Sequence, residues 1–576
     1  MRLTPRAPKV QPTRSGRVMD VVVLMPMVLL IAALLLPSAA LAATGPAISA
    51  PSSADAGGWI EVNGTGFDPR ASVNLAWNGS TSGMPKARAD RLGAFVVALR
   101  VPLDASAGTH QIQAFSAKGG KSIAKRRVEP LATATIQVIA PTSTASPTPT
   151  PSGAPKPSPT PTPVPTPTST PTPTPTPAPA EGCSRIVAAG GSVQAAVDAS
   201  TSGNVICLRG GTYTAFTVAK SGLTISSYPG ETATIRGQTL VRGVSSGTIR
   251  NLSLTGATST FQAGLRVDSS SGVKVSGNRM AGNSLGLFLF NARAALVENN
   301  VVTDNAYGIE VHGATDGTII RSNRVDENDR YLDSARSAGG INFHKTSGGI
   351  IVSDNTFFGN NEVAIEIYAA SNITLTRNSM TGSNDLIETG TESGLPCDNL
   401  RIVRNVGWNS SIGTGGEERG FYLRCASNSI VAHNVLDGMD RFALGIYSSS
   451  GRYSGPIDGL RLLNNIAANG RVYSIDSTLP SSVVIDYNLA VTATGPVNGG
   501  TLAYVYGKGN TSSWDQFRSW TGYDAHGVGT NPAFVDRAHR DYRLSTGSPA
   551  VDRGTMLSGW NDGYLGSAPD MGRYER

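Results

Sequence analysis

The sequence predicts an all-β chain whose large C-terminal part is a parallel β-solenoid, preceded by a small β-sandwich and a Pro/Thr-rich linker. First, an asparagine recurs between short apolar stretches at a near-constant interval. Second, only 6% of the residues are aromatic and 15% charged, with 66 glycines, which suits short strands joined by many turns. Third, 576 residues exceed one ordinary core of roughly 250–300 residues, whereas a solenoid can lengthen coil by coil.

Residues 1–42 have the features of a secretory signal peptide: a basic start, an apolar run over Val21–Leu36 and a small-residue end at Ala40–Ala42. The alternative is an uncleaved membrane anchor, because the apolar run approaches spanning length. Pro26, Pro37 and the small-residue end favour cleavage. We therefore expect a secreted protein, extracellular or associated with the cell surface, with no membrane contact after cleavage.

The net charge of +7 does not indicate a nucleic-acid partner. Much of the excess lies in the leader and in Lys118–Arg127, and the C-terminal part is close to balanced. We expect no nucleic-acid binding, and we expect a monomer.

Residues 43–140 alternate apolar and polar side chains over short stretches separated by Gly and Pro turns, which predicts a small β-sandwich. The predicted strands are Trp59–Val62, Ser72–Leu75, Ala94–Val97 and Thr109–Ile112. The run Val62–Phe67 resembles the opening of bacterial immunoglobulin-like modules of secreted proteins. The resemblance implies a spacer, with glycan binding as the alternative role.

Residues 141–181 are almost entirely Pro, Thr and Ser. With few apolar side chains to bury, such a segment adopts extended polyproline II conformations. It predicts a semi-rigid linker and a domain boundary.

Residues 182–576 carry the repeat. Gly191–Val197 predicts a short helix with Ser192 near its start, which would cover the open N-terminal end of a solenoid. The repeated asparagines are Asn251, Asn278, Asn300, Asn323, Asn355, Asn378, Asn405, Asn434, Asn465 and Asn488. The shortest intervals are 22 and 23 residues, typical of a β-solenoid coil, and stacked asparagines can hydrogen-bond as a ladder.

These repeats are similar to those of the pectate-lyase-like right-handed parallel β-helix superfamily. The C-terminal motifs Asp541–Leu544, Gly547–Asp552 and Asp570–Glu575 resemble the ending of many secreted β-helix proteins. The resemblance implies a right-handed parallel β-helix over 182–576 and a polysaccharide as partner.

The four cysteines form two pairs whose members are about one coil apart. Neighbouring coils lie roughly 4.8 Å apart, which falls within the range of a disulfide. We expect Cys183–Cys207 and Cys397–Cys425, with four free buried thiols as the alternative.

One strand of each coil aligns without gaps: 286–290, 308–312, 340–344, 364–368, 386–390, 420–424 and 443–447. The second and fourth positions are almost all apolar and are expected to face inward, so the third and fifth face outward. The third positions are Phe288, Glu310, Asn342, Glu366, Glu388, Tyr422 and Gly445. The fifth positions are Phe290, His312, His344, Tyr368, Gly390, Arg424 and Tyr447.

This outward face predicts a functional site, because ordinary solvated strands do not stack Glu, His, Arg and aromatic residues. Glu366 and Glu388 would lie about 5 Å apart, where like charges need a proton, a cation or an arginine nearby. A surface ladder that only packs and hydrogen-bonds is the alternative.

Two insertions precede polar strands and are expected to wall the face into a groove. One spans Asp329–Arg336 and the other Trp408–Arg419. The expected substrate-binding residues are Tyr368, Tyr422, Trp408, Arg336 and Tyr447.

The first hypothesis for function is a polysaccharide lyase acting on a uronic-acid glycan by β-elimination, which needs a base and a neutralised carboxylate. The resemblance implies a Lys or Arg base and Ca²⁺ as neutraliser. Lys345 beside His344, with Arg424, are the candidates for base and clamp, and Asn342, Glu366 and Glu388 are the candidate calcium ligands. No complete calcium motif and no full lyase signature of the family is present.

The second hypothesis is a glycoside hydrolase. Glu366 with Glu388 suits the spacing of a retaining enzyme, and Glu310 with Glu366 fits an inverting one loosely, with His312 and Tyr368 positioning the substrate. The third hypothesis is a non-catalytic surface protein that binds glycans on the same face.

Overall fold

The computed structural model describes residues 45–55, 59–68, 71–81, 84, 86–89, 95–102, 105–116, 130–139, 182–328, 339–392, 395–409, 418–448, 453–492 and 500–576. The predicted signal peptide, the predicted linker and Arg336 lie outside the described residues.

The N-terminal part forms two β-sheets around a common core. The first sheet has the order β1 (Ala47–Ser49), β3 (Trp59–Thr65), β6 (Phe95–Arg100). The second has the order β2 (Ser53–Asp55), β8 (Ala132–Ile139), β7 (Gly108–Ser116), β4 (Ser72–Trp77), β5 (Lys86–Arg88). Inward side chains such as Val62, Leu75, Leu99 and Ile112 are almost fully buried. The four strands expected from the sequence are β3, β4, β6 and β7 of this two-layer arrangement.

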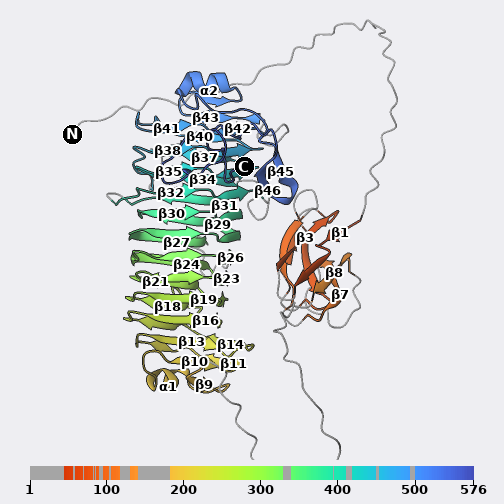
Figure 1. Cartoon of the computed structure of the whole chain (residues 1–576), viewed down its shortest axis with the longest axis vertical. Helices are drawn as coiled ribbons and strands as arrows, with labels where there is room; N and C mark the ends of the chain where they lie inside the picture. The colour runs from red at the N-terminus through yellow and green to blue at the C-terminus, as the bar shows by residue number, and fades with distance from the viewer. Residues whose placement is uncertain are drawn as a thin grey trace, which may run out of the picture.

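The C-terminal part winds into coils whose strands stack in three parallel ladders (Figure 1). The first ladder is a sheet made of β9 (Arg185–Val187), β10 (Val205–Leu208), β13 (Leu223–Ser227), β16 (Gly247–Arg250), β19 (Val273–Ser276), β22 (Leu296–Glu298), β25 (Ile319–Arg321), β28 (Ile350–Ser353), β30 (Ile373–Thr376), β32 (Arg401–Val403), β35 (Ile430–Ala432), β38 (Arg461–Leu463) and β41 (Val484–Asp486).

The second ladder comprises β11 (Gly211–Thr214), β14 (Ala233–Arg236), β17 (Ser253–Thr255), β20 (Arg279–Ala281), β23 (Val301–Thr303), β26 (Arg324–Asp326), the first halves of β29 (Thr356–Tyr368) and β31 (Ser379–Gly390), then β33 (Val406–Trp408), β36 (Val435–Asp437), β39 (Ile466–Ala468) and β42 (Leu489–Val491).

The third ladder comprises β12 (Thr217–Val218), β15 (Thr239–Arg242), β18 (Ala263–Asp268), β21 (Leu285–Phe290), β24 (Tyr307–Ala314), β27 (Gly339–Ser347), the second halves of β29 and β31, then β34 (Arg419–Leu423), β37 (Phe442–Ile446), β40 (Tyr473–Ile475) and β43 (Ala503–Val505), with β44 (Gly509–Thr511) antiparallel at its end. The right-handed parallel β-helix predicted from the sequence is confirmed.

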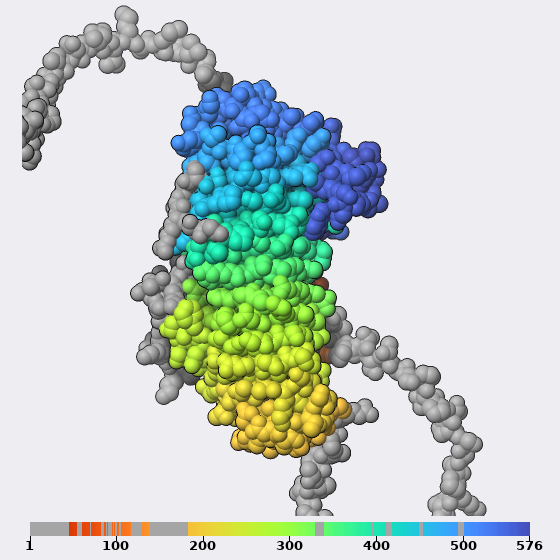
Figure 2. All heavy atoms as spheres, turned by 90° about the vertical axis from the view of Figure 1, so that its left-hand side faces the viewer, coloured from red at the N-terminus to blue at the C-terminus, as the bar shows by residue number. Residues whose placement is uncertain are grey.

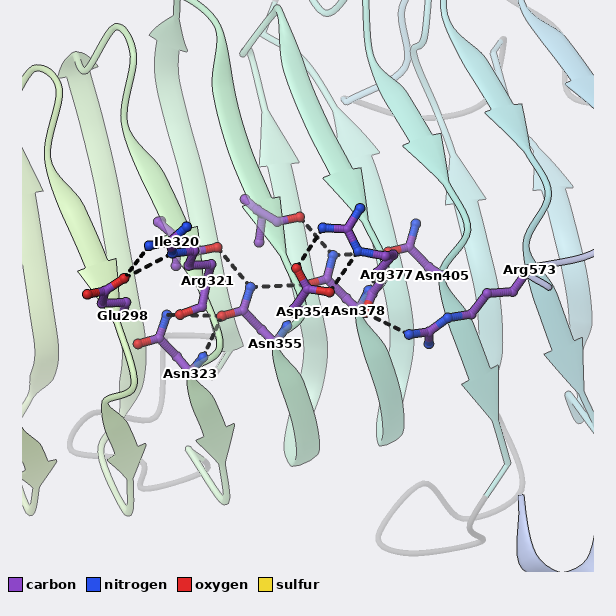
Figure 3. Close-up of polar contacts among 11 residues, drawn as sticks. Glu298, Ile320, Arg321, Asn323, Asp354, Asn355, Arg377, Asn378, Asn405 and Arg573 are labelled. Atoms are coloured by element: carbon purple, nitrogen blue, oxygen red, sulfur yellow. Dashed lines mark hydrogen bonds and ion pairs between the residues drawn. The ribbon is translucent and has the colours of Figure 1, made fainter. Parts of the chain in front are cut away.

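The asparagine ladder occupies the turn between the first and second ladders of strands. Each side-chain amide donates to the side-chain oxygen of the next coil, for example Asn323 to Asn355 at 3.0 Å and Asn355 to Asn378 at 3.0 Å. Figure 3 shows four members of this row, with the ion pairs of Arg321 and Arg377 beside it. The ladder satisfies buried backbone groups at every turn, because each amide also donates to a strand carbonyl.

The tight backbone of this turn belongs to the residue before each asparagine, not to the asparagine itself. Asn299, Ser322, Asp354 and Arg377 have φ between 54° and 58°, in the left-handed region. The expectation for Asn251 is therefore wrong by one residue, because Asn251 is itself the left-handed residue, with φ 56°. Leu252 occupies the ladder position in this coil, and its backbone N–H donates to Oδ1 of Asn278 at 3.1 Å. The ladder begins at Asn278.

A second asparagine ladder lies at the turn between the second and third ladders of strands. Its members are Asn283, Asn305, Asn328 and Asn360, linked at 3.1, 3.0 and 2.9 Å. Each of these asparagines lies five residues after a member of the first asparagine ladder, and this constant offset is the sequence signal that predicts the second asparagine ladder.

Helices close both ends of the solenoid (Figure 1). The predicted N-terminal helix is α1 (Val193–Asp198), with the Ser192 hydroxyl accepting from the amide of Ala195. At the other end, α2 (Trp514–Thr521) stacks Phe517 on Tyr473 with ring centroids 5.1 Å apart. Among the described helices, none is both long and apolar enough to cross a bilayer.

The C-terminal segment folds back along the coils; Figure 2 shows it in dark blue on one side of the continuous stack. It contains β45 (Phe534–Asp536), the 3₁₀ helix η3 (Arg537–His539) and β46 (Asp541–Leu544). Tyr542 and Met571 pack on Val435 and Ile466 of the second ladder. The predicted disulfides Cys183–Cys207 and Cys397–Cys425 are both present, each with a Cα–Cα distance of 5.8 Å.

Candidate active site

The register predicted for the third ladder is confirmed strand by strand. Glu310 pairs with Asn342, Asn342 with Glu366, Glu366 with Glu388, and Glu388 with Tyr422. The second and fourth positions are 0–1% exposed and form the core of the solenoid. Since side chains alternate along a strand, the third and fifth positions stand on the outer face, about 6.6 Å apart along each strand. This surface is called the acid face below.

Asp385 and Arg419 also belong to the acid face, and the sequence alignment missed them. Asp385 lies in the second half of β31 and is the register partner of Arg419, the first residue of β34. The residue that follows this position is small in nearly every coil (Gly286, Gly308, Gly340, Ala364, Gly420 and Ala443), and it has no register partner. The alternation is interrupted there, so the preceding side chain also stands on the outer face, as Leu285 does against Phe288.

Glu310 is held by two donors. Nε2 of His312 lies 2.8 Å from one carboxylate oxygen, and Nδ2 of Asn342 donates to the other at 2.7 Å. His312 stands two residues along the same strand and Asn342 one coil away. Both oxygens of the Glu310 side chain therefore have a protein partner.

Two neighbouring carboxylates are each paired with an arginine. Arg424 forms an ion pair with Glu388, whose side chain is 9% exposed. Arg419 donates from Nη2 to Oδ2 of Asp385 at 2.7 Å. Burial nevertheless raises the pKa of Asp385 to about 7, with Arg419 and Arg424 acting in the opposite direction.

Glu366 is the carboxyl without a cation of its own. Burial and the charges of Glu310, Glu362 and Asp385 together raise its pKa to about 7, while Arg424 opposes them. The carboxyl therefore carries a proton for much of the time near neutral pH. A protonated acid beside carboxylates of different environment is the arrangement that acid–base catalysis uses.

A row of rings runs beside the carboxylates along the fifth positions. Ring centroids are 4.9 Å apart for His312 and His344, 5.3 Å for His344 and Tyr368, and 5.3 Å for Tyr368 and Tyr453. Burial lowers the pKa of His344, and the nearby His312 lowers it further. A neutral imidazole is therefore favoured in the middle of the row.

Tyr422 and Tyr447 lie at the C-terminal side of the face, as expected. Their ring centroids are 4.9 Å apart, and the guanidiniums of Arg419 and Arg424 lie 4.6 and 5.0 Å from the Tyr422 ring. The hydroxyl of Tyr447 is 2.7 Å from that of Ser474.

Lys345 and Trp408 are placed apart from this group. Lys345 has φ 52° at a register shift after His344, and its Nζ lies 2.8 Å from Glu392. Trp408 ends β33 in the second ladder and packs against the C-terminal segment. Their roles as base and substrate platform remain predictions, as does that of Arg336.

The proposed calcium ligands make other contacts. Asn342 donates from Nδ2 to Glu310, which leaves its Oδ1 without a hydrogen-bond partner in the described part of the chain, and Glu388 forms an ion pair with Arg424. Among the described residues, no three His, Cys, Asp or Glu side chains gather as a metal-binding group. Calcium binding by these residues remains a prediction.

The comparisons with known proteins concern the fold. The family model described as "Right handed beta helix region" matches residues 221–380. Comparison with curated proteins finds no match.

Three solved structures illustrate the likeness. Pectate lyase Pel9A is 18% identical, covering 68% of this chain and 97% of its own, with a TM-score of 0.42. A GH87 α-1,3-glucanase catalytic unit from Streptomyces thermodiastaticus is 12% identical, covering 83% and 89%, with a TM-score of 0.44. An alginate lyase from Paenibacillus is 15% identical, covering 60% and 100%, with a TM-score of 0.31. At these identities and TM-scores the likeness does not identify a reaction.

Proposed function

We propose that the acid face is the active site of a glycoside hydrolase, with Glu366 as the general acid and Glu310 as the general base. The observation that carries the proposal is the pair of contrasting carboxyls. Burial and neighbouring carboxylates favour the protonated form of Glu366, whereas both side-chain oxygens of Glu310 lie within hydrogen-bond distance of nitrogens of His312 and Asn342. Two carboxyls in opposite protonation states are what glycoside hydrolysis requires.

The separation supports an inverting reaction. Glu310 and Glu366 are two coils apart in register, which is about 10 Å between backbones. Side chains of this length can bring the carboxyls into the range of roughly 6.5–9.5 Å that leaves room for a water molecule. Glu388 is adjacent to Glu366 but is paired with Arg424, which makes it a weaker nucleophile for a retaining reaction.

In the proposed reaction the bond between the anomeric carbon and the glycosidic oxygen breaks. Glu366 gives its proton to the leaving oxygen, water adds to the anomeric carbon, and Glu310 takes the proton that the water loses. The ring row of His344, Tyr368 and Tyr453 would position sugar rings beside the acid.

Elimination was the first hypothesis from the sequence, and the two arginines on the face favour it as the second candidate. The Lys or Arg base that the sequence resemblance implies is already paired, because Lys345 pairs with Glu392 and Arg424 with Glu388. Hydrolysis uses Glu366 in the protonated form that its surroundings favour, so hydrolysis ranks first.

The test is a screen of the full chain against a panel of polysaccharides, with reducing ends and ultraviolet absorbance of unsaturated ends read in parallel. We expect the wild-type protein to release reducing ends without ultraviolet absorbance, and we expect Glu366→Gln to release none. Absorbance that grows with cleavage would replace hydrolysis by elimination, and glycan binding without cleavage would leave a binding protein.

A further inference from the structure

Arginine and lysine side chains on and beside the acid face form ion pairs with protein carboxylates. Arg419 pairs with Asp385, Arg424 with Glu388, and Lys345 at the edge with Glu392. A sugar carboxylate entering this face would have to displace a protein carboxylate from its arginine. Breaking a buried pair in this way leaves an uncompensated charge, which costs more than the new pair returns.

Two further carboxyls of the acid face, Glu310 and Glu366, have no arginine or lysine partner among the described residues, and Glu362 precedes Glu366 on the same strand, β29. Glu310 is bonded by His312 and Asn342, and Glu362 and Asp385 act electrostatically on Glu366. The local charge is therefore negative even while Glu366 holds a proton. A polyanion approaching the face from solvent meets this repulsion, which salt screens.

The acid face presents groups that can bind an uncharged sugar. Carboxylate oxygens accept hydrogen bonds from hydroxyl groups. The continuous ring row from His312 through His344 and Tyr368 to Tyr453 presents apolar surface beside them. Hydroxyl donors on one side and a carbon–hydrogen face on the other are the surfaces of a neutral pyranose.

We propose that the substrate of this face is an uncharged glycan and that its carboxylates exclude polyuronates. The inference rests on the proposed function for the location of the site, and it names the substrate class. Glu362 is the specificity-determining residue most open to test, because it adds charge to the face and takes no part in the proton transfers proposed above.

The test compares polymers that share a linkage. Polyuronates and the same polymers after chemical reduction of their carboxyl groups are measured for binding to the full chain, beside a panel of neutral glycans. We expect the reduced form to bind at least about tenfold more tightly than its parent at low salt. The gap should narrow as salt rises, since screening weakens repulsion.

A charge reversal ties the preference to the residue. Glu362→Lys should strengthen polyuronate binding, whereas Asp515→Lys, the same charge change on the exposed surface of α2, should not. Equal or tighter binding of the parent polyuronates, or binding of no uncharged glycan, would overturn the inference. If a neutral glycan binds with the expected preference but is not cleaved, the proposed hydrolase function is wrong, whereas the inference of an uncharged glycan as the ligand is supported.

Discussion

Glu366 stands in register beside Glu388 on the next coil, yet only Glu388 has an arginine. Two carboxyls one coil apart, about 5 Å at the backbone, thus have different environments. The pairing of Arg424 leaves Glu366 surrounded by Glu310, Glu362 and Asp385, which favour its protonated form. The proposed role of Glu366, and not Glu388, as the general acid follows from this difference in pairing.

Glu366→Gln should lower kcat by about 10³-fold, because an amide cannot give a proton to the leaving oxygen. The matched control is Glu231→Gln, a carboxyl paired with Arg209 in the N-terminal coils. Steady-state kinetics on the best substrate checks it. A loss in the control as large as in Glu366→Gln would point to folding instead of chemistry.

The activity should fall as pH rises through about 7, because Glu366 must be protonated to act and its pKa lies near that value. Removing a negative neighbour lowers this pKa, so Glu362→Gln should move the falling limb to lower pH. A pH profile of kcat/KM measures the limb. If the falling limb does not move in Glu362→Gln, the limb does not report the ionisation of Glu366.

Glu366→Gln should also stabilise the protein at alkaline pH. The pKa is raised from 4.5 to about 7 in the folded state, so ionisation favours unfolding between those values. Wild-type stability is full below about pH 4.5 and falls until about pH 7, by about 3 kcal/mol in total. Denaturant unfolding should therefore show a gain in the variant at pH 8 that is absent at pH 4; a gain of equal size at both would contradict the assignment.

His433 should make the C-terminal segment sensitive to acid. Its Nδ1 lies 3.2 Å from the carbonyl of Gly572, and Nε2 accepts from the amides of Asn464 and Asn561 at 3.0 and 2.9 Å. Thr555 binds both amides through its carbonyl, which fixes their orientation. Protonation would place a donor against two donors.

Burial and the nearby Arg404 lower the pKa of His433 to about 4, while hydrogen bonds to Gly572 and Asp570 oppose them. Stability is thus full above about pH 6.5 and lost progressively as pH falls toward 4, because the unfolded chain takes up the proton first. His433→Gln should flatten this loss. Hydrogen exchange of residues 552–576 at pH 4 and 7 measures it, and an unchanged pH dependence in the variant would contradict the account.

The asparagine ladder should matter for stability in proportion to its buried bonds. Asn355→Ala removes the acceptor used by Asn323 and the donor to Asn378 and should cost about 2–4 kcal/mol. Asn510→Ala, at an exposed position of β44, should change stability by less than about 0.5 kcal/mol. Equal denaturation midpoints for the two variants would remove the ladder as a stabilising element.

The coil register was predictable because two inward positions that are almost all apolar repeat in the seven aligned strands of the third ladder, with an outward position after each. Asp385 and Arg419 were missed because the alternation is interrupted at the residue after each of them, Leu386 and Gly420, neither of which has a register partner. The pairing of Arg424 with Glu388 was hidden as well, since sequence does not set the direction of a long side chain.

The C-terminal end illustrates a different limit. Helix α2 had local signals, with the hydroxyl of Ser513 accepting from Gln516 and Gly522 ending the helix at φ 71°. The fold-back of the last residues onto Val435 and Ile466 had none, because it joins segments about 100 residues apart in sequence. The same limit placed Trp408 with the acid face in the prediction, whereas it lies in the second ladder.

The most direct test of the acid–base account is cleavage in water labelled with heavy oxygen, followed by mass spectrometry of the fragments. Hydrolysis at the anomeric carbon places one labelled oxygen at each new reducing end, in inverted configuration at first, and Glu366→Gln should abolish these fragments. Unlabelled fragments with unsaturated ends would contradict the account, because elimination breaks the bond without adding water.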